Sequence, residues 1–221
     1  MSVKQQIEDL HATLPSDVTL VAVSKFHPVE AIQEAYDAGQ RIFGESRPQE
    51  LAAKVPQLPA DIEWHMIGHL QTNKVKLIVP FVKLIQSVDS QRLLEEIERQ
   101  AAKCDRTIEI LFEVHLAQDE SKSGWDSKEL LDYISSGALS EFHHIRPRGV
   151  MTIGTLTDDI ELNKSEFRAL RALFEQLRPT FGEEFDTVSM GMTSDYKEAI
   201  ECGSTMVRIG SMIFGQRDYS R

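Results

Sequence analysis

The sequence is poor in cysteine and has no long hydrophobic run. Its 221 residues include only two cysteines, Cys104 and Cys202, and they lie far apart. This spacing predicts neither a disulfide framework nor a metal site. No stretch approaches the roughly 20 apolar residues that span a bilayer. Residues 1–14 also lack the apolar core and small-residue cleavage site of a signal peptide. We therefore expect a cytoplasmic protein with no membrane partner.

Positive charge is also scarce. The chain has 24 lysine and arginine residues against 35 aspartate and glutamate residues, which gives a formal net charge of −11. A nucleic-acid-binding protein needs a basic face for the phosphate backbone, so the composition argues against a nucleic-acid partner. Apolar content, by contrast, is high. The 41% of hydrophobic residues can form a sizeable core, which argues against disorder.

Short apolar runs alternate with helical patterns along the whole chain. The predicted strands are residues 20–25, 41–44, 62–68, 84–88, 108–116, 148–152, 187–191 and 206–210. The predicted helices are residues 28–36, 48–55, 73–78, 91–103 with Asp89 as N-cap, 127–134, 164–177 and 196–200, and residues 1–14 form a further amphipathic pattern.

This order of elements favours parallel strands, because each crossover between parallel strands needs a helix. About eight such units close a parallel barrel. We expect one α/β domain over residues 1–221, a (β/α)8 barrel of the TIM type with an extra N-terminal helix. A doubly wound open sheet is the alternative, since element order does not exclude it.

Lys25 ends the first predicted strand, an otherwise apolar run. In a barrel of this kind, the active site lies at the C-terminal ends of the strands. The lysine is therefore either a rim residue in a salt bridge or an amine that condenses with an aldehyde. The second role requires the neutral amine, so the pKa must fall from about 10.4 through desolvation or a nearby cation.

Two loops rich in small and hydroxyl residues follow the seventh and eighth predicted strands. They are SMGMTSD at residues 189–195 and RIGS at residues 208–211. Barrels frequently bind phosphate at this place, where backbone N–H groups and hydroxyls can donate to the anion. A plain helix-capping role for Thr193 or Ser194 is the alternative.

Arg208 lies inside an apolar strand, which is costly unless something pairs with the guanidinium. Strand alternation puts Arg208 on the same face as Gly210, and thus deeper under a ligand held there. An ion pair with a buried carboxylate such as Glu113 is the alternative. An aldehyde-seeking lysine, a phosphate site and a deep arginine together describe a site for pyridoxal 5′-phosphate (PLP).

Five segments of the chain resemble the pyridoxal phosphate homeostasis protein family, which is related to the barrel domain of alanine racemases. They are VAVSK at residues 21–25, FGE at 43–45, HMIGHLQ at 65–71, GMTSD at 191–195 and VRIGS at 207–211. The order and spacing of the motifs match over nearly the whole chain. Two positions differ from the family pattern, because Ser46 and His115 stand where the family usually has asparagine.

The resemblance implies that PLP is bound covalently, as a Schiff base with Lys25. It further implies that Arg208 faces the pyridine nitrogen and that three residues hold the phosphate, namely Thr193, Gly210 and Ser211. On the same basis the cofactor-binding set includes Ser46, His65 and Met192, with His65 expected to order the rim of the third strand rather than to transfer protons.

The resemblance also implies a binding protein rather than an enzyme, so we assign no catalytic residue. An arginine beside the ring nitrogen leaves it unprotonated and a weaker electron sink, because two positive charges in contact repel. Racemases with this arginine use a tyrosine from a second domain, which we expect to be absent because the chain ends at Arg221. None of the four tyrosines, Tyr36, Tyr133, Tyr196 and Tyr219, is an evident substitute.

We therefore expect a monomeric, non-catalytic PLP-binding protein involved in intracellular vitamin B6 homeostasis, with PLP-dependent apo-enzymes as candidate partners. The alternatives are a minimal PLP-dependent amino-acid racemase and a PLP-independent aldolase that uses a Schiff base.

Overall fold

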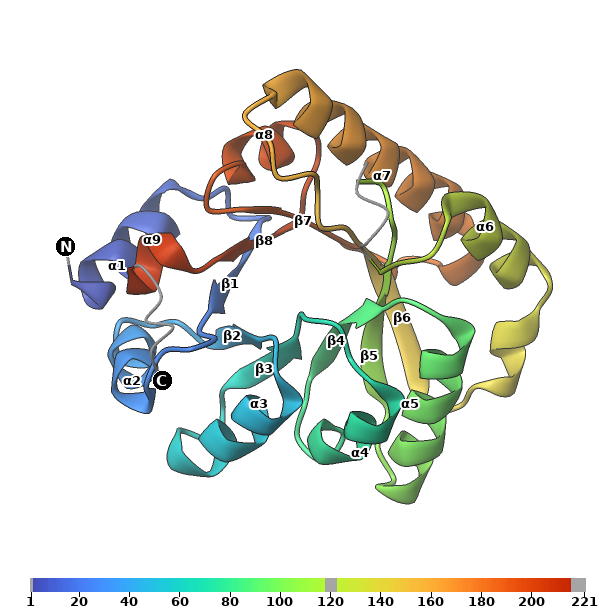
Figure 1. Cartoon of the computed structure of the whole chain (residues 1–221), viewed down its shortest axis with the longest axis horizontal. Helices are drawn as coiled ribbons and strands as arrows, with labels where there is room; N and C mark the ends of the chain where they lie inside the picture. Colours follow the sequence, from blue (N-terminus) through green and yellow to red (C-terminus); the bar gives the residue numbers. More distant parts are fainter. Residues whose placement is uncertain (1, 118–122, 216–221) are drawn as a thin grey trace.

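Eight parallel strands close into a barrel in the computed structural model, which describes residues 2–117 and 123–215. They are β1 (Thr19–Val23), β2 (Ile42–Glu45), β3 (Glu63–Met66), β4 (Leu84–Val88), β5 (Ile108–Glu113), β6 (Ile145–Met151), β7 (Thr187–Met192) and β8 (Met206–Ile209). Each strand pairs with the next, and β8 returns to pair with β1, with Thr19 opposite Met206 (Figure 1). The expected (β/α)8 barrel is confirmed, and an open sheet is excluded.

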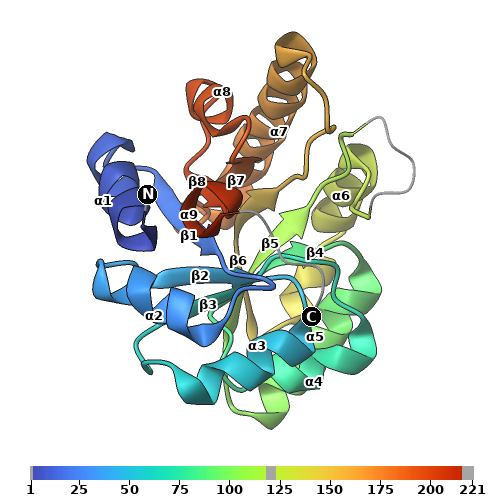
Figure 2. The same cartoon turned by 60° about the vertical axis from the view of Figure 1, so that its left-hand side comes forward.

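Helices surround the barrel. They are α1 (Val3–Thr13), α2 (Val29–Asp37), α3 (Pro48–Lys54), α4 (Val75–Ile78), α5 (Gln91–Lys103), α6 (Ser127–Ser135), α7 (Ile160–Phe181), α8 (Tyr196–Glu201) and α9 (Ser211–Phe214), with short 3-10 turns η1 (Val55–Gln57), η2 (Thr72–Lys74) and η3 (Ala138–Glu141). The extra N-terminal helix α1 begins after Ser2, whose hydroxyl accepts from the Gln5 amide as an N-cap. It lies beside α2 and α9 (Figures 1 and 2). Within the described ranges no helix is both long and apolar enough to cross a bilayer.

One helix cap and one helix start differ from the expectation. The N-cap of α5 is Ser90 rather than Asp89, because the Asp89 carboxylate accepts from the Ser90 hydroxyl and lies 3.0 Å from the His69 ring. Helix α7 begins earlier than residue 164, because the Asp159 carboxylate caps two first-turn amides. Helix α5 thus keeps its expected bounds, and capping by Asp159 moves only the start of α7.

The barrel wall separates two apolar cores. Side chains that face outward pack under the helices and form the larger one. The smaller one fills the barrel itself and consists of Val21, Leu84, Leu111, Met151 and Met206. Because successive side chains of a strand point to opposite faces, Glu109 and Glu113 share the inner face of β5 with Leu111, and Arg208 shares the inner face of β8 with Met206.

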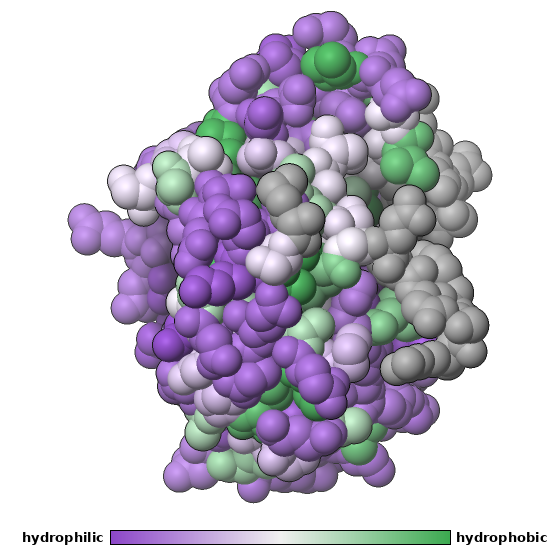
Figure 3. Space-filling view, turned by 90° about the vertical axis from the view of Figure 1, so that its left-hand side faces the viewer, coloured by the Kyte–Doolittle hydropathy of each residue, from purple (hydrophilic) through white to green (hydrophobic). Residues whose placement is uncertain are grey.

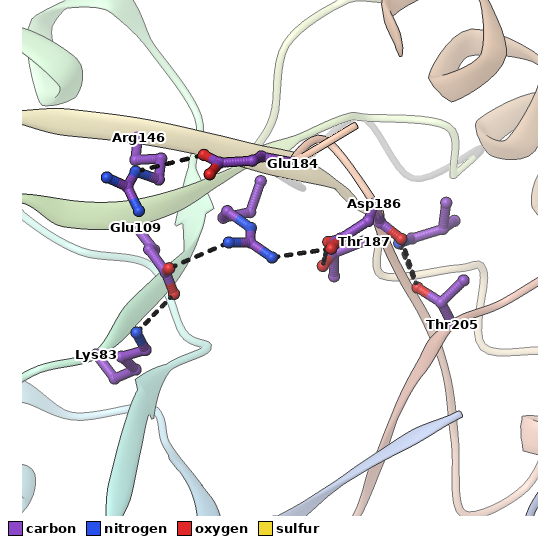
Figure 4. A network of polar contacts seen from close by, with 9 residues as sticks. Lys83, Glu109, Arg146, Glu184, Asp186, Thr187 and Thr205 are labelled. Carbon is purple, nitrogen blue, oxygen red and sulfur yellow. Dashed lines mark hydrogen bonds and ion pairs between the residues drawn. The ribbon is translucent and has the colours of Figure 1, made fainter. Parts of the chain in front are cut away.

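A hollow of about 400 Å³ opens at the N-terminal ends of the strands, and we call it the N-terminal hollow. Its charged side chains pair mainly with one another (Figure 4). Glu109 lies 3.2 Å from the Lys83 amine and 3.3 Å from the Arg148 guanidinium, which lies 2.8 Å from Asp186. In barrels of this type the N-terminal face serves stability. On the side where α1 and α2 lie, the outer surface is mostly hydrophilic, with scattered hydrophobic residues (Figure 3).

Candidate functional site: a pocket at the C-terminal ends of the strands

A pocket of about 370 Å³ lies at the opposite end of the barrel, and we call it the C-terminal pocket. Its volume falls in the range of roughly 300–1,000 Å³ that is typical of small-molecule sites. The lining residues are Val23, Lys25, Ser46, Ile67, Ile153, Leu156, Met192, Thr193, Ser194, Arg208, Gly210 and Ser211. The structure thus brings together every cofactor-binding residue expected from the sequence except His65.

His65 lies elsewhere, and its expected place at the rim is wrong. It is 3% exposed and lines the N-terminal hollow, with its Nδ1 atom 2.9 Å from the Gln86 amide. The physical reason is the length of β3, which ends at Met66. Ile67, which follows the strand, reaches the C-terminal pocket, whereas the His65 side chain points into the barrel interior below it.

Lys25 does not end β1 but lies in the loop that follows it, between two residues with fixed backbones. On one side, Ser24 is fully buried. Its amide donates to the Gly44 carbonyl at 3.0 Å, and its hydroxyl donates to Glu45 Oε1 at 2.7 Å. These bonds attach the start of the loop to β2. The position of Lys25 is therefore set by the barrel wall.

On the other side, Phe26 has a left-handed backbone with φ of 67°. A bulky residue rarely adopts this conformation, and such strain persists only where the surroundings enforce it. Here the Phe26 amide donates to Glu50 Oε1 at 2.7 Å, and the Arg47 guanidinium lies 4.4 Å from the centre of the phenyl ring. Both contacts come from the start of α3, so this helix holds the Lys25 loop in a strained shape.

A buried charge cluster lies beneath the same loop. The Lys54 amine is 2.7 Å from both Glu45 and Glu50, and it donates to the Ser24 carbonyl at 2.9 Å. Burial raises the pKa of Glu45, although the Lys54 charge opposes this shift. Sequence reasoning missed Glu50 and Lys54, because a glutamate and a lysine four residues apart on a helix look like an exposed pair.

The hydroxyl side of the pocket depends on the last residues of β7 and on the tight turn that follows them. Gly191 has φ of +93°, and a Cβ atom there would lie 2.6 Å from Ala199 Cβ. Only glycine fits both conditions. Beyond the turn, Asp195 Oδ1 accepts from the Met192 amide at 2.6 Å, and burial raises the Asp195 pKa.

This turn brings Thr193 next to the loop after β8. The Gly210 amide donates to the Thr193 hydroxyl at 3.4 Å, and Ser211, the first residue of α9, lines the same pocket. Hydroxyl and amide donors from two loops therefore gather at one corner. Such a donor set suits an anion.

Arg208 lies deeper in the pocket and is 5% exposed. Its Nη1 atom donates to the Ser189 hydroxyl at 2.6 Å, and Nη2 donates to the Thr152 carbonyl at 2.8 Å. Burial lowers its pKa to about 10, so the guanidinium remains charged at neutral pH. The alternative of a direct Glu113 ion pair is wrong, because both bonds go to neutral oxygens and Glu113 acts on Arg208 through its charge alone.

The two residues that differ from the family pattern have different places. Ser46 lines the pocket, and the chain at Gly68 approaches it closely, since a Cβ atom at Gly68 would lie 2.6 Å from the Ser46 carbonyl. His115 is not among the lining residues of the described chain. Its amide donates to the Trp125 carbonyl at 2.9 Å, and its buried Nδ1 atom has no partner there.

The residues present fit the group that the sequence implies. Lys25 offers an amine, Arg208 a cationic donor, and Thr193 with Ser211 hydroxyls for a phosphate. Between them, the apolar walls are Val23, Ile67 and Ile153. This arrangement matches a flat aromatic ring that carries an anionic group at one end.

Several known proteins are similar to this chain over most of its length. The family model of the alanine racemase N-terminal domain matches residues 2–218. The chain is 40% identical over 210 residues to a pyridoxal phosphate homeostasis protein of Pasteurella multocida, covering 93% of this chain and 89% of that protein. It is 37% identical over 204 residues to the protein of the same name from Schizosaccharomyces pombe, covering 91% and 85%.

Two solved structures show the same barrel. PipY of Synechococcus elongatus with PLP bound superposes with a TM-score of 0.88 at 36% identity, over 97% of this chain and all 100% of that one. Alanine racemase of E. faecalis shares the fold with a TM-score of 0.74 at 16% identity, over 97% of this chain and 57% of that one. From its sequence and its barrel, this chain belongs to the pyridoxal phosphate homeostasis protein family, built on the alanine racemase N-terminal domain.

Proposed function

We propose that this protein binds PLP in the C-terminal pocket, as a Schiff base with Lys25, and serves PLP homeostasis in the cytoplasm without catalysing a reaction. The observation that carries the proposal is the placement of Lys25 and the buried Arg208 in one pocket with the hydroxyls of Thr193 and Ser211. The names of the relatives and the PLP-bound PipY structure support it.

Each residue has a separate task in binding. Lys25 would hold PLP covalently, through its neutral amine and the aldehyde of PLP, with loss of water. Arg208 would donate an N–H to the pyridine nitrogen and, because the guanidinium is charged, would keep a proton off that atom. Thr193, Ser211 and the Gly210 amide donate to the phosphate. When bound, PLP supplies an aldehyde and an aromatic ring that can accept electrons.

Proton transfer opposite the Lys25 amine would need a second acid or base in the pocket. Among its lining residues in ranges 2–117 and 123–215 there is neither tyrosine nor histidine. Tyr36 donates to Asp61 and the Tyr133 ring packs on Trp125, while Tyr219 lies outside the described residues. A positioned acid or base contributes roughly 10²–10⁴ in rate. The protein then holds PLP as a reversible store from which apo-enzymes can draw.

The visible spectrum of the purified protein mixed with PLP, followed by borohydride reduction and peptide mapping, tests ligand, linkage and residue together. We expect a yellow protein with the label on the Lys25 peptide. Lys25→Ala should lose the trapped label, whereas Lys83→Ala, which removes an amine from the N-terminal hollow, should keep it. Equal trapping at another lysine in Lys25→Ala would overturn the assignment of Lys25.

The non-catalytic part of the proposal has its own test. The PLP-loaded protein is incubated with alanine in heavy water, and exchange of the α-proton is followed by NMR. We expect a rate no higher than that of free PLP. Exchange at an enzyme-like rate would instead indicate a racemase.

A further inference from the structure

A chain of hydrogen bonds leads from Arg208 into the interior of the barrel. Arg208 Nη1 donates to the Ser189 hydroxyl at 2.6 Å, and this hydroxyl donates to Gln86 Oε1 at 2.7 Å. Gln86 Nε2 then lies 2.9 Å from His65 Nδ1. Ser189 and Gln86 are fully buried, and His65 and Arg208 are 3% and 5% exposed. Four side chains from β8, β7, β4 and β3 thus form one continuous buried path.

The direction of every bond in this chain follows from its first member. A guanidinium can only donate, so the Ser189 oxygen accepts and its single hydrogen goes to Gln86 Oε1. The Gln86 amide must then present its NH2 group to His65, whose Nδ1 atom therefore carries no proton. Burial lowers the pKa of His65 to about 3, so the imidazole is neutral at neutral pH and carries a single ring proton. The chain is thus an ordered row of dipoles that starts at a charge.

The chain also joins the two ends of the barrel. Arg208 lines the C-terminal pocket, and His65 lines the N-terminal hollow. With Nδ1 occupied by Gln86, the remaining proton of the neutral imidazole lies on Nε2. No residue between the two ends is charged, so the row orients the guanidinium without neutralising it. A carboxylate in the place of Ser189 would hold the guanidinium as firmly but would cancel much of its charge.

We propose that Ser189, Gln86 and His65 are positioning residues that orient the Arg208 guanidinium toward the ring nitrogen of PLP while leaving its positive charge intact. The inference rests on the proposed function, since it concerns how the same pocket sets the protonation of the bound ring. It assigns His65 an indirect role, exerted through two other side chains from the opposite end of the barrel.

The decisive experiment compares PLP with an analogue that has a C–H group in place of the ring nitrogen. Ser189→Ala removes the acceptor of Arg208 Nη1, and a neutral hydrogen bond of about 0.5–1.5 kcal/mol corresponds to roughly a twofold to tenfold loss of affinity. We expect this loss for PLP, together with a shifted absorption spectrum, and no loss for the analogue. Ser189→Thr, which keeps the hydroxyl, should restore both readouts.

A matched control is Ser204→Ala. Ser204 is 4% exposed, and its hydroxyl donates to backbone carbonyls, including that of Met190 at 2.8 Å, rather than receiving from Arg208. Ser204→Ala should lower the unfolding free energy without shifting the absorption spectrum of bound PLP. Gln86→Leu should shift the spectrum as Ser189→Ala does, and His65→Phe by less, because the effect weakens with distance along the row. Equal losses for PLP and the analogue would reduce Ser189 to a structural role and overturn the inference.

A second measurement needs neither PLP nor a variant. Nitrogen-15 NMR of the ligand-free protein reports which ring nitrogen of His65 carries the proton. We expect the proton on Nε2 and none on Nδ1 at neutral pH. A proton on Nδ1 would break the row at Gln86 and reject the inference even if every variant failed to fold. If the wild-type protein bound no PLP, the proposed function would fail instead, whatever this spectrum showed.

Discussion

Two glutamates on the inner face of β5 have opposite surroundings, because one is paired with cations and the other is buried without a cationic partner among the described residues. Glu109, at the N-terminal end, lies between the Lys83 amine at 3.2 Å and the Arg148 guanidinium at 3.3 Å (Figure 4). Glu113, at the C-terminal end, is 4% exposed and accepts from the Ser123 hydroxyl at 3.4 Å, while its Oε2 atom has no partner in the described chain. Burial raises the Glu113 pKa to about 7.

The two glutamates represent the two ends of the barrel. The N-terminal hollow and the C-terminal pocket have similar volumes, about 400 and 370 Å³, so size does not tell them apart. Their electrostatics do. Charges in the hollow largely satisfy one another, whereas Arg208 in the pocket is held by neutral oxygens and keeps a charge to offer a ligand. Charge pairing, rather than cavity volume, therefore distinguishes the two ends of the barrel.

The largest expected effect separates the two arginines. Arg208→Leu removes the proposed charged donor to PLP, worth about 1.5–3 kcal/mol, so PLP affinity should fall by up to roughly a hundredfold. Arg148→Leu breaks two ion pairs in the hollow and should leave PLP affinity unchanged. Equilibrium titration by absorbance measures both. A comparable loss in Arg148→Leu would remove the distinction between the two ends.

The next effect concerns the dependence of stability on pH. Because the Glu113 pKa is raised from 4.5 to about 7 on folding, its contribution is fully present below pH 4.5 and is lost as pH rises toward 7. Glu113→Gln removes this loss. At about 1.4 kcal/mol per pH unit at most, its unfolding free energy should gain about 2 kcal/mol relative to wild type between these pH values.

Urea unfolding at a series of pH values tests this expectation. His65 acts in the opposite direction, because its pKa is lowered to about 3 and its contribution is lost as pH falls from 6.5. The informative quantity is therefore the difference between wild type and variant. Glu109→Gln retains Glu113 and should retain the fall. A flat difference curve for Glu113→Gln would show that Glu113 titrates normally.

A smaller effect is expected from the corner of the C-terminal pocket where Thr193, Gly210 and Ser211 lie together. Thr193→Val removes one proposed donor to the phosphate, in a loop that solvent partly reaches, so PLP affinity should fall by about tenfold. Binding of pyridoxal, which lacks the phosphate, should change much less. Competition titrations with the two ligands make the comparison. Equal losses for both ligands would place the phosphate elsewhere.

The smallest effect belongs to the paired glutamate. Lys83 is 47% exposed in its pair with Glu109, and such partly solvated pairs contribute less than about 1 kcal/mol. Glu109→Gln should therefore lower the unfolding free energy slightly, and the difference should shrink in high salt as screening grows. A salt-independent loss of several kcal/mol would indicate that the hollow depends on this glutamate as a buried charge.

The parts of the site that sequence reasoning located share a strong local signal. Lys25 and Arg208 are charged residues in or beside apolar runs, and such residues need a reason to be there. The alternation of strands and helices is equally local, which is why the barrel could be predicted. The prediction for His65 was wrong because strand alternation gives the face on which a side chain lies but not its depth along the barrel axis. That depth depends on how the strands are staggered around the barrel.

Other contacts were beyond sequence reasoning for a different reason. Glu50 and Lys54 form an ordinary pair along α3, and nothing in their spacing shows that the helix presses them under the Lys25 loop. The Gln86–Ser189 bond joins β4 to β7, residues 103 positions apart in the chain. Both contacts arise from tertiary packing. The residue types and their spacing in the sequence do not predict which side chains will meet.

Closure of the barrel by β1 and β8 has a consequence for how the protein is made. Lys25 follows the first strand and Arg208 lies in the last, and these two strands pair across the seam with Val21 opposite Arg208. During synthesis the Lys25 amine leaves the ribosome long before Arg208 is made. Contacts between residues so distant in sequence form late and slowly. If both residues bind PLP as proposed, affinity for PLP arises only with the finished barrel. A ligand that contacts both β1 and β8 stabilises the closed barrel by mass action. PLP would therefore raise the stability of the newly folded protein.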